Sequence, residues 1–527
     1  MRKKNKIEHF KASFGKLKDE EYNFELIEKY FRDKDNSGSF QELSDKTCSD
    51  LDFEELFMFL DRTTSKIGQQ CLYNKLRVLP NNSDGIDRKE KIIQALSEDS
   101  ELRIRTQLQL DKLCKNDVYY VSTLFQEEYA KPPKWFFVIR LLSFTSLLSL
   151  LLFPFNPQLF FVFFTVFIVN LIIHYWNKRN LYKYLGSIPQ LLRLHKVAVN
   201  LNKEKLFTDI DPKLDDSIRI LNQVRNRMSF FRLDAHLQSE MEAVFWFLLE
   251  LFKITFILEP LLLFGILDRL DRKRIEIEKV FSYVGEVDIL LSIASLRKGL
   301  DTYCLPKISE SNFSATGVCH PLIYNCVPNS IQLSDKSILL TGSNMSGKTS
   351  FIRAIGINTL CGLTINTCFA EQMTLPRVRI FSAIRISDDL LNDKSYYFEE
   401  VLTIKDMIDN SANGKPNLFL LDEIFKGTNT IERISAGKAV LSSLANRNNI
   451  VFVSTHDIEL TDLLQQEYEL FHFSELVNEN NVDFDYKLKE GKLLNRNAIR
   501  ILQINNYPND LIDEAIALSK TLDNKSS

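Results

Sequence analysis

The sequence predicts two structural classes in one chain: an α/β domain with a phosphate-binding loop in the C-terminal part, and an all-α region before it that carries a hydrophobic helical hairpin. The first observation is the glycine-rich segment TGSNMSGKTS at residues 341–350, between a short apolar run and a helical pattern. The second is that short β-branched and aromatic runs alternate with helical patterns after Asn325. The third is an uncharged stretch from Leu141 to Ile173, within long helical patterns.

Composition sets few limits on function. The 66 basic and 69 acidic residues give a net charge of −3, so overall charge argues neither for nor against a nucleic-acid partner. A length of 527 residues predicts about three structural units. The eight cysteines show no C-x-x-C pair and no metal-ligand spacing, which favours free thiols in a reducing compartment over disulfides. The basic N-terminus has no apolar run behind it and is not a secretory signal.

The N-terminal part is charged and then helical. Residues 1–45 are polar and end in RDKDNSGSFQE, which predicts a linker or mobile segment. Residues 46–130 place apolar side chains at three- and four-residue spacing, for example in LDFEELFMFLDRT, which predicts helices. Residues 181–310 continue as long helical patterns with few glycines or prolines.

Residues 131–180 predict a transmembrane hairpin. Two apolar segments, about 135–153 and 158–176, are separated by PFNPQ, whose two prolines break a helix. Each segment is close to the roughly 20 residues that a helix needs to cross a bilayer. Trp135 at one end and Trp176 at the other fit the aromatic belts of a membrane interface. The alternative is a hydrophobic hairpin packed inside the protein or inside a dimer.

The charges around this hairpin predict its orientation. Basic residues flank both outer ends, and the connecting turn has none. By the positive-inside rule, this predicts a cell-membrane protein with two spans, whose termini and C-terminal domain lie in the cytoplasm. The flanking basic residues are Lys131, Lys134, Lys178, Arg179 and Lys183.

A second apolar stretch, Ala243 to Leu270, is expected to be a core helix of the helical region. Glu250, Lys253 and Glu259 interrupt it, and each would cost roughly 2.5 to 3.5 kcal/mol at the centre of a membrane.

The glycine-rich segment has the context of a nucleoside-triphosphate site. KSILLTG reads as a strand and TSFIRAIGINTLCGL as a helix, and strand–loop–helix is the arrangement in which backbone N–H groups hold phosphates. Lys348 would reach the β- and γ-phosphates, and the Thr349 hydroxyl would bind Mg²⁺. The predicted nucleotide-binding residues of the loop are Gly342, Ser343, Asn344, Met345, Ser346, Gly347, Lys348, Thr349 and Ser350.

Two further strand ends supply candidate catalytic groups. NLFLLDE is an apolar strand ending in two acids, of which Asp422 is placed to bind the magnesium with Thr349 and Glu423 to polarise the attacking water. NIVFVSTHD is a third strand, ending in His456 where a γ-phosphate sensor would lie. The predicted catalytic residues are Glu423, His456 and Lys348, the predicted cofactors are ATP and Mg²⁺, and the predicted activity is a Mg-dependent ATPase.

These segments together resemble the MutS family of DNA mismatch-repair ATPases. TGSNMSGKTS, YYFEEV, LFLLDEIFKGTNT and VSTHDIEL stand in the order of that family's ATPase motifs, and Asn344 and Met345 are its distinctive pair. LDRTTSKIGQQCLYNKLRVLP resembles the start of the family's core domain, and VGEVDILLSIASL the end of its lever helices. The resemblance implies an α/β P-loop domain of the ABC type at 311–495, and all-α core and lever helices at 46–130 and 181–310. It also implies a helical dimerisation tail at 496–527.

The resemblance also implies roles for single residues. CHPLIYNCVPNSIQL resembles the H-P segment before the loop, which implies a nucleotide contact for Asn329. Ser395 and Glu400 fall in the signature segment that approaches the partner subunit's nucleotide in the family, so a composite site in a homodimer is implied. Phe425 and Lys426 depart from the family, which has glycine and arginine there.

The resulting hypothesis is a short, dimeric, membrane-anchored MutS-type ATPase that acts on mismatched or branched DNA. Residues 1–45 leave no room for the family's mismatch-reading and connector domains, so wedge-type mismatch recognition is not expected. The alternative is a membrane-tethered nucleotide switch that binds a protein or lipid partner without DNA. A transport ATPase is disfavoured, because two spans are few for a permease and no L-S-G-G-Q-like segment is present.

Overall fold

The computed structural model describes residues 2–526 apart from 83, 130, 181, 229–239, 344, 386–395, 447, 478–481, 494–501 and 503–506. The chain divides into two compact units, and it passes between them several times. Unit 1 contains residues 1–35, 60–74 and 84–299, and unit 2 contains residues 36–59, 75–83 and 300–527.

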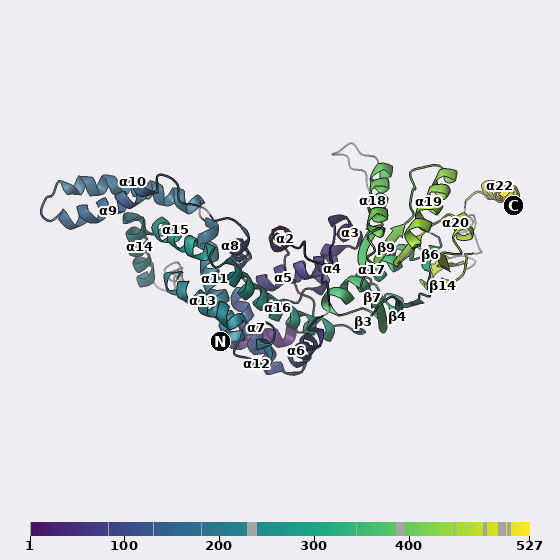
Figure 1. Cartoon of the computed structure of the whole chain (residues 1–527), viewed down its shortest axis with the longest axis horizontal. Coiled ribbons are helices and arrows are strands. Elements are labelled where there is room, and N and C mark those ends of the chain that lie inside the picture. The colour runs from purple at the N-terminus through teal and green to yellow at the C-terminus, as the bar shows by residue number, and fades with distance from the viewer. Residues whose placement is uncertain are drawn as a thin grey trace. The chain divides into compact units, whose positions relative to one another are not determined.

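Unit 1 is helical (Figure 1). The α16 helix, Arg274–Lys298, is its centre: most of its side chains are buried, and α6, α11 and α13 pack against it. The other helices are α1 (Arg2–Ser13), α2 (Phe24–Arg32), α5 (Lys66–Arg77), α6 (Ile86–Glu98), α7 (Ser100–Leu110), α8 (Thr123–Gln126), α9 (Phe136–Leu152), α10 (Leu159–Asn180), α11 (Tyr182–Leu201), α12 (Lys205–Thr208), α13 (Leu214–Met228), α14 (Glu240–Thr255) and α15 (Leu258–Asp271), with short 3₁₀ turns at Asp111–Leu113 and Asn116–Val121.

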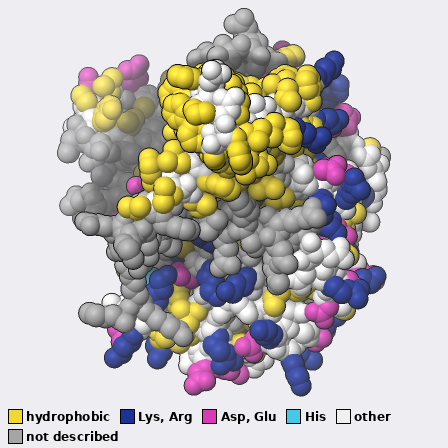
Figure 2. Space-filling model, turned by 90° about the vertical axis from the view of Figure 1, so that its left-hand side faces the viewer, with side chains coloured by type: hydrophobic (Ala, Val, Ile, Leu, Met, Phe, Trp, Pro, Cys, Tyr) yellow, Lys and Arg dark blue, Asp and Glu magenta, His cyan; other side chains and the backbone are white. Residues whose placement is uncertain are grey.

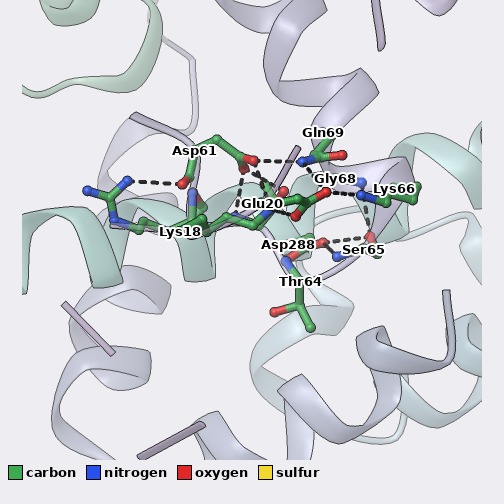
Figure 3. A network of polar contacts seen from close by, with 12 residues as sticks. Lys18, Glu20, Asp61, Thr64, Ser65, Lys66, Gly68, Gln69 and Asp288 are labelled. Atoms are coloured by element: carbon green, nitrogen blue, oxygen red, sulfur yellow. Dashed lines mark hydrogen bonds and ion pairs between the residues drawn. The ribbon is translucent and has the colours of Figure 1, made fainter. Parts of the chain in front are cut away.

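A buried polar network joins the start of α5 to α16 (Figure 3). The Asp288 carboxylate accepts hydrogen bonds from the backbone N–H groups of Thr64 and Ser65, at 2.8 and 2.7 Å. Burial raises the pKa of Asp288 to about 6, although these hydrogen bonds act in the opposite direction. Burial would also raise the pKa of Asp61, but the charge of Lys18, 2.8 Å away, and several hydrogen bonds lower it.

The first 45 residues differ from the linker expected for them. Residues of α2 have the periodic apolar face that a packed helix needs, and Ile27, Tyr30 and Phe31 are buried. The Asn23 side chain caps this helix by accepting from the Leu26 N–H. The polar stretch RDKDNSGSFQE leads into strand β1 (Gln41–Glu42), which pairs with β2 (Val78–Leu79) in unit 2. The stretch contains the boundary between unit 1 and unit 2, after Asp35, and its glycine and serines form the turn before that strand.

The predicted hairpin forms two helices, α9 and α10, whose apolar side chains point outward. Within the described part of the chain, Leu159–Trp176 is one helical segment long and apolar enough to cross a bilayer, and only 11% of it is buried. Phe136–Leu152 is a shorter apolar helix. Figure 2 shows the hydrophobic side chains gathered on this end of unit 1, with Lys and Arg side chains at the border. The hairpin is therefore not buried inside its own unit, whereas its crossing of a membrane stays a prediction.

The second apolar stretch is not one core helix. It forms α14 and α15, separated at Ile257, whose φ of 46° lies in the left-handed region. Pro260 lies in the first turn of α15, where its missing N–H costs no helical hydrogen bond, whereas a continuous helix would lose one there. The α15 helix is mostly buried, but α14 carries exposed apolar side chains.

Unit 2 contains an α/β domain with a six-stranded sheet in the order β14-β11-β6-β10-β9-β8. All neighbouring pairs are parallel except β11 and β14. The α17 helix covers one face, where Gly356 lies against Leu420, and α18 and α19 cover the other, where Phe419 and Leu421 belong to the hydrophobic core. Its other elements include a four-stranded sheet in the order β3-β7-β4-β5.

The bounds of the elements of unit 2 are α3 (Asp45–Asp50), α4 (Phe53–Leu60), β3 (Lys307–Ser309), β4 (Ser314–Val318), β5 (Asn329–Gln332), β6 (Ser337–Thr341), α17 (Lys348–Ile365), β7 (Gln372–Pro376), β8 (Arg379–Ala383), α18 (Tyr396–Ser411), β9 (Asn417–Asp422), α19 (Thr430–Ala445), β10 (Asn449–Ser454), α20 (Ile458–Leu463), β11 (Tyr468–His472), β12 (Glu475–Val477), β13 (Val482–Phe484), β14 (Lys489–Glu490) and α22 (Asn509–Ser526).

Residues 36–59 belong to this α/β domain, whereas the sequence placed most of them with the core helices. Asp50 accepts hydrogen bonds from the Ser382 hydroxyl and from the N–H groups of Ile384 and Arg385, so it caps the end of β8. Asp52 pairs with Arg353 on α17, at 3.3 Å. These contacts join positions far apart in sequence, which local periodicity does not report.

Candidate functional site

The predicted phosphate-binding loop joins the central strand β6 to α17. Gly342 and Gly347 have φ values of 151° and 109°, and a Cβ on Gly342 would lie 2.6 Å from the Phe473 carbonyl oxygen. Glycine is therefore required at Gly342 by conformation and by space. The N-terminus of α17 opens directly behind the loop, which is the arrangement that binds phosphate.

Lys348 lies over this loop. Its Nζ donates hydrogen bonds to the carbonyl oxygens of Gly342 and Ser343, at 2.8 Å each. Burial lowers the pKa of this ammonium, and the carboxylates of Glu423 and Asp422 act against that shift. The positive charge is thus held inside the loop, where it would face the phosphates.

Thr349 and Asp422 meet where β9 and α17 approach each other. The Thr349 hydroxyl donates to Asp422 Oδ2 at 2.7 Å, and the Ser454 hydroxyl donates to Oδ1 of the same carboxylate. Mg²⁺ prefers oxygen ligands, and a hydroxyl beside a carboxylate fits this ion. The parallel strands explain the convergence, because β6, β9 and β10 all end at the same edge of the sheet.

Glu423 and His456 also lie at this edge. His456 Nε2 is 2.6 Å from Glu423 Oε1, and Lys426 Nζ is 2.5 Å from Oε2. Burial alone would raise the pKa of Glu423, but the hydrogen bonds and charges of His456 and Lys426 hold it at about 2. Glu423 has a φ of 52°, an uncommon conformation for this residue type and one that is found at functional sites.

A cavity of about 560 Å³ opens beside the loop and is bordered by Asn329, Cys326 and Glu423. The Asn329 amide donates to the carbonyl oxygens of Val327 and Tyr486, and its Oδ1 accepts from the Leu488 N–H. Asn329 thus joins strand β5 to residues 486–488 and shapes the cavity wall. The remaining lining residues are Val318, His320, Ile323, Tyr324, Asn325, Val327, Ser343, Met345, Ser346, Gly347, Lys348, Thr349, Ser350, Phe351, Ala354, Phe473 and Tyr486.

Three residues of this region were not found from the sequence. The rings of Phe473 and Tyr486 lie over Gly347, with Tyr486 Cδ1 3.3 Å from the position that a Cβ would take. Glu475 accepts a hydrogen bond from the Ser343 hydroxyl at 2.5 Å. All three come from the segment after β11, which has no phosphate-loop or strand-end motif, so no local signal marks them.

Glu400, which the resemblance places in the signature segment, is buried within its own chain. Its side chain is fully buried (0% exposed), and it accepts a hydrogen bond from the Phe425 N–H in its own chain. Burial raises its pKa, partly opposed by that hydrogen bond. Through this hydrogen bond Glu400 holds the loop after β9 in its own chain, whereas the approach of its segment to a partner's nucleotide stays a prediction. Ser395 and Asn344 lie outside the described residues.

Comparison with known proteins agrees with the motifs and the geometry. Residues 338–523 match MutS domain V. The chain is 30% identical over 268 residues to "DNA mismatch repair protein MutS" of Oceanobacillus iheyensis, covering 48% of this chain and 30% of the relative. It is 29% identical over 264 residues to the protein of that name from Aquifex pyrophilus, covering 47% and 30%. For the protein of that name from Fusobacterium nucleatum, the identity is 26% over 264 residues, covering 47% and 29%.

The matched part thus spans less than a third of the length of these curated relatives. The residues that match MutS domain V include the phosphate loop, the parallel strands β6, β9 and β10, and the acidic pair at the end of β9. On these grounds, residues 338–523 are a domain of the MutS domain V family, and the chain is similar over about half its length to the curated MutS proteins.

Proposed function

We propose that this chain is a membrane-anchored, dimeric MutS-type ATPase that binds ATP with Mg²⁺, hydrolyses it and acts on mismatched or branched DNA. One observation carries the ATPase part of the proposal: Lys348, the Thr349–Asp422 pair and the Glu423–His456 pair converge beside one glycine loop.

The geometry supports a division of roles. The loop N–H groups and Lys348 bind the phosphates, and Thr349 and Asp422 hold Mg²⁺, which neutralises charge on the phosphate oxygens when it is bound. Glu423 is ionised at neutral pH, but a pKa of about 2 makes it a weak base. We therefore assign it to accept a hydrogen bond from the attacking water and to orient it, with His456 holding the carboxylate from the other side.

Three features support the remaining parts. Met345 at the cavity is 82% exposed, as a residue at a subunit contact would be before assembly, which supports a composite site in a homodimer. The outward-facing apolar side chains of α9 and α10 support a two-span anchor in the cell membrane, and the basic residues at both outer ends support an orientation with both termini and the ATPase domain in the cytoplasm. The names of the relatives support DNA as the partner.

The first test is Glu423→Gln, which keeps the shape of the side chain and removes its charge. We expect ATP binding to change little, whereas hydrolysis falls by about 10²-fold or more, the range of a positioned acid–base group. Glu490→Gln, an exposed carboxylate on β14, is the matched control and should hydrolyse ATP like the parent protein. Phosphate release and nucleotide binding by the detergent-solubilised protein are the measurements. Hydrolysis at the parent rate by Glu423→Gln would contradict the assignment.

A membrane-tethered nucleotide switch without DNA is the second candidate. It is favoured by the near-neutral charge of the chain and by the large apolar surface of unit 1. The two candidates differ in DNA binding, which only the MutS-type ATPase that acts on DNA requires.

A further inference from the structure

The α14 helix carries an apolar stripe that is exposed among the described residues of unit 1. Val244, Phe247, Leu248 and Phe252 are exposed, and Phe247 is 64% exposed. Their spacing of three, one and four residues places them on one face of the helix. Four large apolar side chains on one face of a helix are the kind of exposed surface that marks an interaction site.

Two charged residues of this helix whose side chains are described, Glu250 and Lys253, face the opposite way. Glu250 Oε1 lies 3.2 Å from Nε2 of His174 on α10, and Lys253 Nζ lies 3.1 Å from Oε1 of Glu259 on α15. His174 and Lys253 are buried. Glu250 and Lys253, whose charges argued against membrane contact, are therefore paired inside unit 1, and neither lies on the apolar stripe.

The hairpin shows the same arrangement of polar groups inside and apolar groups outside. Asn170 on α10 is buried, and its amide donates to the Ser146 hydroxyl on α9 at 3.0 Å and to the Thr255 carbonyl oxygen at the end of α14 at 2.7 Å. Interhelical hydrogen bonds beneath an apolar exterior are typical of helices packed in lipid. The end of α14 is thus fixed directly against the hairpin.

The direction of α14 fits the surface of a bilayer. Figure 1 draws α14 at a steep angle to α9 and α10, so a hairpin that crosses a membrane leaves α14 close to the membrane plane. Its contact with His174 lies near the end of α10 that is predicted to be cytoplasmic, and its contact with Asn170 lies further towards the middle of Leu159–Trp176. The stripe therefore continues the apolar surface of the hairpin at the level of the cytoplasmic interface.

We infer that α14 is a third membrane element: an interfacial helix that lies in the cytoplasmic leaflet of a phospholipid bilayer with Val244, Phe247, Leu248 and Phe252 among the acyl chains. The inference rests on the proposed membrane crossing of α9 and α10. Lipid is favoured over a second copy of the chain because the stripe is continuous with the hairpin surface, and because Asn170 and His174, behind both surfaces, contact Ser146, Thr255 and Glu250 rather than the exterior.

The test uses tryptophan fluorescence in phospholipid vesicles whose acyl chains carry bromine, a contact quencher. The chain has three tryptophans, Trp135, Trp176 and Trp246, and replacing all three with Phe gives a silent background. Single probes are then introduced as Phe247→Trp on α14, Phe164→Trp on α10 (52% exposed) and Ile431→Trp, an exposed control on α19 of unit 2. Phe252→Trp is a second probe on the stripe.

An interfacial helix buries its apolar face roughly 5–10 Å into the boundary of headgroups and acyl chains. The Phe247→Trp probe should therefore lose about half its fluorescence when bromine is near the headgroup, and less when it is near the chain end. The Phe164→Trp probe should be quenched more strongly by bromine near the chain end, and the Ile431→Trp probe by neither lipid.

The outcomes separate the two proposals. Quenching of Phe164→Trp without quenching of Phe247→Trp and Phe252→Trp overturns the inference about α14 and leaves the hairpin anchor standing. If those two α14 probes are also shielded from acrylamide, a second copy of the chain covers the stripe instead. Absence of quenching at all three membrane probes overturns both proposals.

Discussion

Glu423 illustrates how neighbouring residues decide the chemistry of a carboxylate. Its two oxygens face His456 and Lys426, and these partners outweigh the effect of burial, so its pKa falls to about 2. A lowered pKa means that the stabilisation by these pairs is present above the usual pKa of 4.5 and is lost as the pH falls towards 2. Lys426, which replaces the family's usual arginine, thus contributes directly to the state of this site.

Removal of Lys426 tests its effect on the pKa of Glu423. Lys426→Met takes away one of the two cations, so the pKa of Glu423 should rise towards its usual value and the acid limb of hydrolysis should move to higher pH. Single-turnover hydrolysis measured between about pH 4 and 8 reports the shift, because the limb set by a pKa of about 2 lies below this range in the parent protein and should approach it in the variant. Lys438→Met removes a similarly exposed lysine from α19 and should leave the limb in place. An identical acid limb in both variants would show that Lys426 does not control Glu423.

At the scale of elements, the crossing of α5 and α16 explains two glycines of unit 1. A Cβ on Gly68 would lie 2.2 Å from Asp288 Oδ2, and a Cβ on Gly285 would lie 2.2 Å from Cys71 Sγ. The two helices approach closely enough that Asp288 reaches the N–H groups of Thr64 and Ser65. The close approach and the buried carboxylate therefore depend on each other.

Gly68→Ala tests this packing. The new methyl group must displace Asp288 from its hydrogen bonds, so unit 1 should lose roughly 1–3 kcal/mol of stability, as overpacked cores do. Gly186→Ala in α11 is the control, because no atom lies within 4 Å of its new methyl group, and it should gain up to about 1 kcal/mol from helix propensity. Pulse proteolysis in urea measures both changes. Equal stabilities of the two variants would mean that α5 and α16 separate easily.

At the scale of the whole molecule, the question is what the helical region of unit 1 binds. If it holds DNA, its lysines and arginines must contact phosphates, and each such contact releases counterions. A protein of nearly neutral net charge can do this only through local basic surfaces.

Salt dependence therefore decides between the two candidate functions. We expect the detergent-solubilised protein to bind duplex, mismatched or branched DNA in filter binding, and to lose at least about tenfold in affinity between 50 and 200 mM salt. Lys348→Ala serves as the control for nucleotide dependence, because it weakens ATP binding without touching the helical unit. DNA binding that is absent, or that does not respond to salt, would favour the switch that acts without DNA.

The convergence of the candidate site residues was predictable because its signals are local. A strand, a glycine loop and a helix occupy consecutive residues, so Lys348 and Thr349 could be assigned without knowledge of the fold. Asp422, Glu423 and His456 follow short apolar strands, and the parallel sheet confirms that these strand ends lie together. Local pattern also found the α9–α10 hairpin, whose uncharged length exceeds that of ordinary helices of soluble domains.

Only the tertiary structure decided the positions of side chains whose contacts lie far away in the sequence. It placed Asp50 and Asp52 against the ATPase domain, buried Glu400 under the loop after β9, and turned Glu250 and Lys253 inward towards His174 and Glu259. A sequence gives the period and charge of each element, but it does not say which face another element covers. For α14 the tertiary structure turns an expected core helix into a candidate membrane surface. The pairing of Glu250 and Lys253 offsets part of the cost of taking their charges out of water.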